Sequence, residues 1–181
     1  MAVSSKHLVV IGGGAAGFFC AVNAARMSPG LRVTIVEKSG KVLQKVKVSG
    51  GGRCNLTHDC DSIATMAKCY PRGEKFVKKL FHHFFTHDTV EWFTSRGVPV
   101  KAERDGRMFP KSDSSQSVID CLLGEANKFH VDLVLHFAVE KIAHSEKGWK
   151  IVAADKRSLE ADYLCIACGG FPKQEMFHWI T

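Results

Sequence analysis

The sequence predicts an α/β protein that opens with a Rossmann-like βαβ unit. An apolar, β-branched run at 7–11 leads into a glycine-rich turn, and an alanine-rich helix is expected over 15–27. A second apolar run at 31–36 is expected to be the next buried strand, after serine, proline and glycine at 28–30 have ended the helix. Strand, glycine turn, helix and strand in this order form one βαβ unit.

The rest of the chain mixes helices and strands and becomes β-rich towards its end. Residues 38–47 are basic and are expected to form a loop or a short surface helix. Helices are expected from Gly73, from Asp88 to about Gly97, and after a cap at Ser114 or Ser115. Strands are expected at 98–102, 107–109, 132–137, 139–144, 149–154 and 163–168, the last of them buried.

An apolar stripe marks the helix expected after Gly73. Its side chains recur at helical spacing, which predicts a helix that packs into the core with His82 and His83 as incidental neighbours. Asp88 with Glu91 three residues later resembles a capping pair for the next helix. The stripe consists of Phe76, Val77, Leu80, Phe81, Phe84 and Phe85.

Length and composition limit the class of protein. A chain of 181 residues supports one well-buried core and is too short for two full-sized domains. Its net charge of +7 favours anionic partners, but the basic residues are dispersed and form no basic-aromatic stripe for nucleic acid. The uncharged stretch 8–25 contains four glycines, which favours a soluble strand-turn-helix over a membrane span. With no secretory signal, we expect a cytoplasmic protein.

The seven cysteines are expected to be reduced. If Cys165 and Cys168 lie on a strand, their Cα atoms are roughly 10 Å apart at about 3.3 Å per residue, too far for a disulfide. The spacing of Cys54, His58, Cys60 and Cys69, with the nearby histidines, matches no zinc finger or ribbon, so no metal site is expected.

Gly12, Gly14 and Gly17 form a dinucleotide fingerprint. Gly12 permits a tight turn, Gly14 lets the backbone approach a pyrophosphate at the N-terminus of the following helix, and Gly17 lets that helix lie close to the strand. Glu37, twenty residues after Gly17, is suited to accept hydrogen bonds from ribose hydroxyls and to repel a 2′-phosphate. The alternative is that Glu37 is an ordinary exposed acid at a strand end. NAD and FAD both use this fingerprint.

A second glycine-rich segment, residues 49–55, favours FAD. Its backbone N–H groups and its one cation, Arg53, are suited to a flat ring that carries negative charge when it is reduced. The alternative is an ordinary flexible surface loop.

Four segments together resemble one flavoprotein family. They are IGGGAAG at 11–17, VEK at 36–38, VSGGGRCNLT at 48–57 and the segment 105–123. The sequence is similar to the HI0933-like or YhiN-like proteins, often called NAD(P)/FAD-dependent or aminoacetone-oxidase-family oxidoreductases. The resemblance implies a Rossmann-like FAD-binding fold of the glutathione reductase-like type with a β-meander. It also implies that residues 1–181 are an incomplete FAD-binding domain, truncated before the family's inserted substrate domain and its flavin-covering C-terminal segment.

The resemblance also implies a set of cofactor-binding residues. Cys168 stands where the family has threonine, and a thiol hydrogen-bonds more weakly than a hydroxyl. The implied residues are Gly12, Gly14, Ala15, Ala16 and Gly17 at the pyrophosphate; Glu37 at the ribose; Lys38 elsewhere on the cofactor; Lys45, Ser49, Gly50, Gly51, Arg53, Cys54 and Asn55 along the ribityl chain or flavin; Val139 at the adenine; and Ala167 and Gly169 in a turn that returns to the cofactor.

The function expected from the sequence is therefore an FAD-dependent oxidoreductase acting on an unknown small molecule. NAD(P)H is a candidate electron donor, and amine oxidation is a second option. The alternative is a nucleotide-binding fragment without chemistry. Cys54 is followed by Cys60, one residue too far for the Cys-x4-Cys motif of disulfide reductases. No catalytic residue is identified, no membrane or nucleic-acid partner is expected, and nothing in the sequence fixes the oligomeric state.

Overall fold

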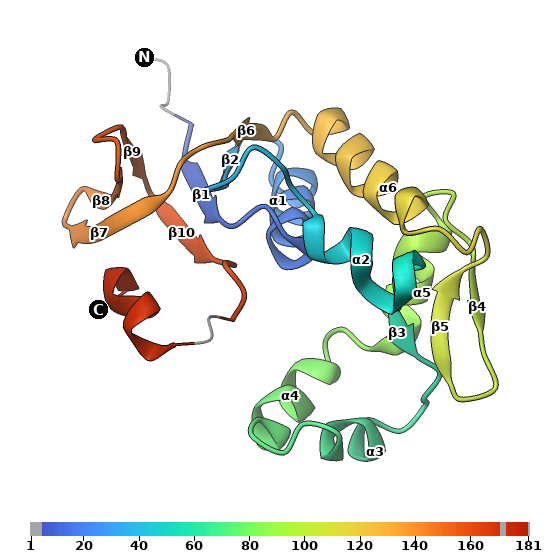
Figure 1. Cartoon of the computed structure of the whole chain (residues 1–181). Coiled ribbons are helices and arrows are strands. Elements are labelled where there is room, and N and C mark those ends of the chain that lie inside the picture. The colour runs from blue at the N-terminus through green and yellow to red at the C-terminus, as the bar shows by residue number, and fades with distance from the viewer. Residues whose placement is uncertain (1–4, 171–172, 181) are drawn as a thin grey trace. The chain divides into compact units, whose positions relative to one another are not determined.

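The computed structural model describes residues 5–170 and 173–180 (Figure 1). The chain folds as two compact units. The first unit comprises residues 1–45 and 122–181, and the second comprises residues 46–121. The assignment of residues 1–181 to one cofactor-binding domain stays a prediction.

A parallel sheet forms the centre of the first unit. Its strand order is β10–β1–β2–β6, and all three pairings are parallel. Val9, Val10 and Ile35 are fully buried, as expected for strands of a parallel sheet that is covered on both faces. The strands are β1 (His7–Ile11), β2 (Arg32–Val36), β6 (Asp132–Val134) and β10 (Tyr163–Ile166).

Helix α1 (Ala15–Met27) covers one face of this sheet (Figure 1). It starts directly after the glycine turn and has the bounds expected from the sequence. Its packed side consists of small and apolar residues, among them Phe18, Ala21 and Val22. The predicted βαβ unit is therefore confirmed.

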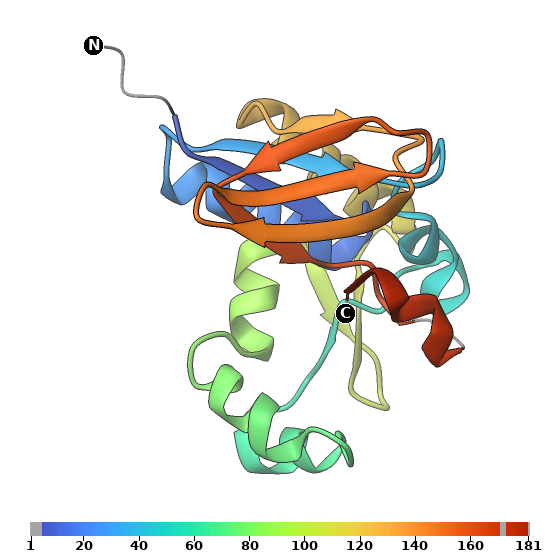
Figure 2. The same ribbon diagram turned by 90° about the vertical axis from the view of Figure 1, so that its left-hand side faces the viewer.

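A three-stranded antiparallel meander lies against the other face of the sheet (Figure 2). It consists of β7 (Val139–Ser145), β8 (Gly148–Ala153) and β9 (Ser158–Ala161). The pairing of β7 with β8 was expected, whereas β9 was missed because its four residues bury only Ala161. The cluster between the layers contains Val9, Ile11, Val36, Phe137, Ile151, Ala153, Ala161 and Trp179.

The prediction that the last strand is buried is wrong. In the described sheet β10 lies at an edge, beside β1 alone, so Tyr163 is 53% exposed and Ile166 is 41% exposed. The strand expected over 132–137 is also shorter, because the chain adopts a left-handed conformation at His136 (φ +53°).

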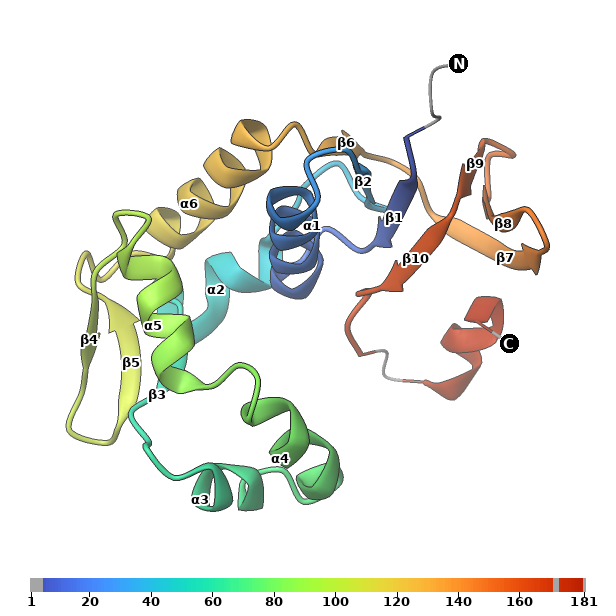
Figure 3. The same cartoon turned by 180° about the vertical axis from the view of Figure 1, so that it is seen from behind.

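The second unit contains the antiparallel sheet β3–β5–β4 with helices around it (Figure 3). The strands are β3 (Thr57–His58), β4 (Val100–Ala102) and β5 (Arg107–Pro110). The helices are α2 (Gln44–Gly52), which begins at the end of the first unit and leaves helical geometry at residues 49–51, α3 (Ile63–Lys68), α4 (Glu74–Phe81), α5 (Thr86–Thr94) and α6 (Ser115–Lys128), whose second half belongs to the first unit. Ser114 caps α6, as expected, by accepting the N–H of Gln116 at 3.2 Å.

The prediction that the apolar stripe packs into the core is wrong. In the described part of the chain, α4 buries none of its residues, and Phe76 is 68% exposed. The helix ends at Phe81, so the stripe does not continue as one surface, and only Phe85, before α5, is buried.

The cap expected at Asp88 is also displaced. The Asp88 carboxylate accepts the N–H of Phe85 at 2.6 Å, so α5 begins two residues earlier, at Thr86, and ends at Thr94. Among the described helices, none is long and apolar enough to cross a membrane.

Candidate nucleotide-binding site

The glycine turn lies at the carboxyl end of β1, where open α/β sheets bind their ligands. Gly12 has φ +117° and donates its N–H to the carbonyl of Val36 at 2.8 Å. A Cβ at Gly12 would lie 2.5 Å from the carbonyl oxygen of Ala167. Glycine is therefore required at this position both by its conformation and by the close approach of the turn after β10.

The other two fingerprint glycines have opposite surroundings. A Cβ at Gly17 would lie 1.9 Å from the carbonyl oxygen of Gly12, so the start of α1 sits directly against the turn. A Cβ at Gly14 would meet no described atom within 4 Å. Gly14 is the N-cap of α1, and within the described chain no side chain caps this helix. Its exposed first residues, Ala15 and Ala16, thus border an open helix N-terminus that favours an anion.

Glu37 is held beside this turn by three hydrogen bonds. Its Oε2 accepts the N–H of Gly13 at 2.9 Å, and its Oε1 accepts both the N–H and the Oγ–H of Ser39 at 2.9 Å. A carboxylate has about four lone-pair positions. One position on Oε2 is therefore left for a further donor such as a ribose hydroxyl.

A cavity of about 200 Å³ opens at the same edge of the sheet. Two residues expected from the sequence, Lys38 and Val139, line it together with Gly12 of the fingerprint. The residues of its remaining walls are apolar or carry a thiol, and apart from Cys168, in the turn expected to return to the cofactor, none is a cofactor contact expected from the sequence. They are Ile11, Val36, Phe137, Ala138, Cys168, Met176 and Trp179.

The turn after β10 joins this arrangement. Ala167 donates its N–H to the carbonyl of Ile11 at 2.8 Å, and Gly169 has φ +74°. The Nζ of Lys45 would lie 3.7 Å from a Cβ at Gly169. The structure thus brings the predicted residues Lys45, Ala167 and Gly169 together.

The second glycine-rich segment forms a defined left-handed loop. Gly50, Gly51 and Gly52 have φ values of +56°, +69° and +85°, and Cys54 has φ +63°. The N–H of Cys54 donates to the carbonyl of Ser49 at 3.0 Å and closes the loop. These contacts argue against the flexible-loop alternative.

Arg53 of this loop is already engaged within the second unit. Its guanidinium lies 4.0 Å from the centroid of the Phe109 ring and forms ion pairs with Glu103 and, at 3.7 Å, with Asp113. Asn55 is exposed. The positive charge of Arg53, which was predicted to face a flavin, is thus neutralised by two carboxylates of the second unit.

The Cys54 thiol is only 6% exposed, and burial raises its pKa. It is therefore a neutral thiol near pH 7, whereas redox-active cysteines work as thiolates. All seven cysteines are free, and the described residues contain no group of three or more histidines, cysteines or acids that could hold a metal.

The sequence matches the HI0933-like protein Rossmann domain over residues 6–176. This chain belongs to the HI0933-like family. The expected α/β Rossmann-like fold with a parallel sheet is confirmed by this match and by the strand order of the first unit.

The HI0933-like chain has characterised relatives. It is 36% identical over 167 residues to the 3-dehydro-bile acid delta(4,6)-reductase of Clostridium scindens, covering 91% of this chain and 39% of that protein. It is 27% identical over 165 residues to the ribosomal RNA dihydrouridine synthase of Haemophilus influenzae, covering 90% and 40%. The chain thus spans about two fifths of the length of these relatives.

Solved structures share the fold. The 3-ketosteroid-delta4-(5alpha)-dehydrogenase of Rhodococcus jostii RHA1 superposes with a TM-score of 0.68 at 16% identity, covering 98% of this chain and 49% of that one. At this level of identity the likeness concerns the fold alone.

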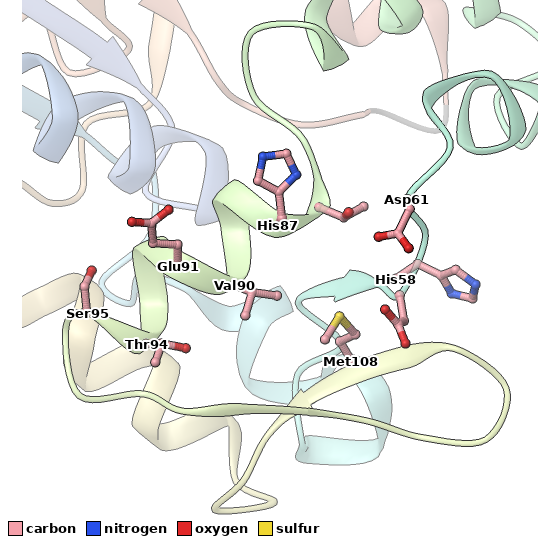
Figure 4. A pocket seen from close by; sticks show the side chains of 10 residues that line it. His58, Asp61, His87, Val90, Glu91, Thr94, Ser95 and Met108 are labelled. Atoms are coloured by element: carbon pink, nitrogen blue, oxygen red, sulfur yellow. The ribbon is translucent and has the colours of Figure 1, made fainter.

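A second cavity, of about 630 Å³, lies within the second unit (Figure 4). Val90 and Met108 project into it, and His87 and Asp61 stand at its rim. No sequence pattern indicates this cavity, because its residues come from β3, the segment after β3, α5 with its C-cap, and β5. The other lining residues are His58, Asp59, Thr86, Glu91, Thr94 and Ser95.

Proposed function

We propose that this HI0933-like chain is the FAD-binding part of a flavin-dependent oxidoreductase. One observation carries the proposal: the open space at Gly14, beside the uncapped N-terminus of α1, adjoins the carboxylate of Glu37. This combination offers an anion site and a ribose acceptor at the carboxyl edge of a parallel sheet.

The donor set fits an adenine dinucleotide part by part. The pyrophosphate would approach Gly14 and the N–H groups of Ala15 and Ala16, where a larger residue at Gly14 would fill the space. A ribose hydroxyl would donate to the remaining position on Glu37, and the adenine would enter the cavity that Val139 lines. For the flavin end, Lys45 and the loop over 49–55 stay predictions from the family resemblance.

FAD supplies the capacity to accept and return a hydride. This chain's own residues bind and orient the cofactor, and we assign none of them a catalytic role. NAD(P)H as the electron donor and a cytoplasmic location are part of the proposal.

The substrate is left open between two classes. The relatives are named for a bile acid and for ribosomal RNA, so the absence of a nucleic-acid partner stays a prediction. The net charge of +7 is compatible with RNA but does not select it.

The test is flavin retention. The purified chain should keep its flavin absorption bands after desalting, or should be stabilised thermally by added FAD. Gly14→Val should abolish both effects, because its side chain fills the space for the pyrophosphate. Gly30→Val is the matched control, since a Cβ at Gly30 also meets no described atom within 4 Å but lies outside the fingerprint. Equal flavin retention by the two variants would reject the proposed site.

The alternative, a nucleotide-binding fragment without chemistry, makes a different prediction. Such a chain would bind FAD, but the bound flavin would not be bleached anaerobically by NADH or NADPH. Bleaching at a rate above that of free FAD would favour the oxidoreductase.

A further inference from the structure

The C-terminal segment η1 (Gln174–Ile180) packs onto the first unit next to β7. Trp179 is only 8% exposed and belongs to the same buried cluster as Ile11, Val36 and Phe137. This segment is therefore anchored at the edge of the sheet that holds the glycine turn.

The 3₁₀ geometry of η1 brings two of its side chains together. Residues three apart eclipse one another in a 3₁₀-helix, so Met176 and Trp179 lie on one face. Both line the 200 Å³ cavity, although Met176 is 40% exposed. The segment thus contributes a thioether and an indole group to the wall of that cavity.

The size and lining of the cavity select a class of ligand. Pockets for whole drug-sized ligands hold about 300–1,000 Å³, so about 200 Å³ leaves room for one flat ring system. The walls are mainly apolar, with Lys38 contributing a polar group. Indole and thioether groups favour aromatic rings, and a base stacks well on such a surface.

We propose that Met176 and Trp179 form a wall of the adenine subsite, so that the C-terminal segment controls retention of adenine nucleotides. This inference rests on the proposed function, which brings an adenine dinucleotide to the adjoining Gly12 turn. It goes beyond the family match, which ends at residue 176 and does not include Trp179.

Tryptophan fluorescence of the 181-residue chain tests the proposal. The chain has three tryptophans, and of these only Trp179 lines the cavity in the described residues. AMP titration should quench the emission of the wild type and of the controls Trp92→Phe and Trp149→Phe. In Trp179→Phe the quenching should disappear, and the Kd for AMP from calorimetry should rise about three- to tenfold.

A second variant covers the case in which Trp179→Phe misfolds. Met176→Ala truncates a half-exposed side chain and should raise the Kd for AMP about threefold while the thermal unfolding temperature is unchanged. FMN, which lacks adenine, should bind both variants as it binds the wild type. Unchanged AMP affinity in Met176→Ala and in folded Trp179→Phe would overturn the inference. Failure of the wild type to bind AMP, ADP or FAD would instead reject the proposed function, and the inference with it.

Discussion

Replacing Gly17 with alanine should destabilise the fold strongly, although the change adds only one methyl group. The new Cβ would lie 1.9 Å from the carbonyl oxygen of Gly12 and 3.5 Å from Cγ1 of Val10. Unstrained contacts begin near 3.5 Å, so the start of α1 would have to move by more than about 1 Å. The obstacle is backbone, which cannot rotate away as a side chain would.

The expected cost follows from overpacking. Such insertions cost about 1–3 kcal/mol and occasionally more, and the backbone contact places Gly17→Ala at the upper end, about 3 kcal/mol. For a chain of this length, each kcal/mol lowers the unfolding temperature by about 2–4 °C. Thermal unfolding followed by far-UV circular dichroism should therefore show a fall of about 6–12 °C.

Gly14→Ala is the matched comparison, since it makes the same chemical change in the same motif. Gly14 has φ −93° and ψ −173°, an extended conformation open to any residue, and its Cβ would meet no described atom within 4 Å. Because Gly14 is the N-cap of α1, where alanine is less favourable than glycine, the free energy of unfolding should fall by no more than about 1 kcal/mol. If Gly17→Ala and Gly14→Ala unfold at the same temperature, the close approach of α1 to the glycine turn is refuted.

Two further predictions concern titrating groups. Lys6 donates a hydrogen bond of 2.7 Å to Asp162 and lowers the pKa of that carboxyl below 3.8. The ionised Asp162 therefore stabilises the folded protein above the pKa that the carboxyl has in the unfolded chain. This stabilisation is lost as pH falls below about 4. The free energy of unfolding, measured with urea at several pH values, should therefore fall less steeply below about pH 4 for Asp162→Asn than for the wild type. Equal dependence of this free energy on pH in the two proteins would contradict the prediction. Iodoacetamide at about pH 8 should label the exposed Cys69 before the buried Cys54 and before Cys20, whose pKa is raised to about 11 by burial and by the neighbouring Cys165 thiol. Peptide mapping by mass spectrometry measures the order of labelling, and equal labelling in the folded protein would count against the burial of Cys54 and the partial burial of Cys20.

Local patterns account for the parts of the fold that the sequence predicts well. The bounds of α1 match because its start depends on adjacent glycines and its end on residues 28–30. The glycine turn and Glu37 come together because parallel strands end at the same edge, so their meeting needs no long-range information beyond the βαβ order.

The features that the sequence misses depend on long-range placement. Met176 and Trp179 reach the cavity only because η1 returns to β7, and no local pattern reports such a return. The apolar stripe of α4 has the periodicity of a core helix. Periodicity shows that a helix has an apolar face, but it does not show whether another part of the chain covers that face. Arg53 was recognised as a cation, whereas its partners Glu103 and Asp113 lie fifty or more residues away.

The left-handed loop over 50–54 has a consequence for how its sequence can vary. Each of its three glycines has a positive φ, which ordinary side chains rarely adopt, and a Cβ at Gly50 would also lie 2.8 Å from the Phe109 ring. Backbone handedness therefore restricts which residues this segment can accept, whether or not the loop contacts a cofactor.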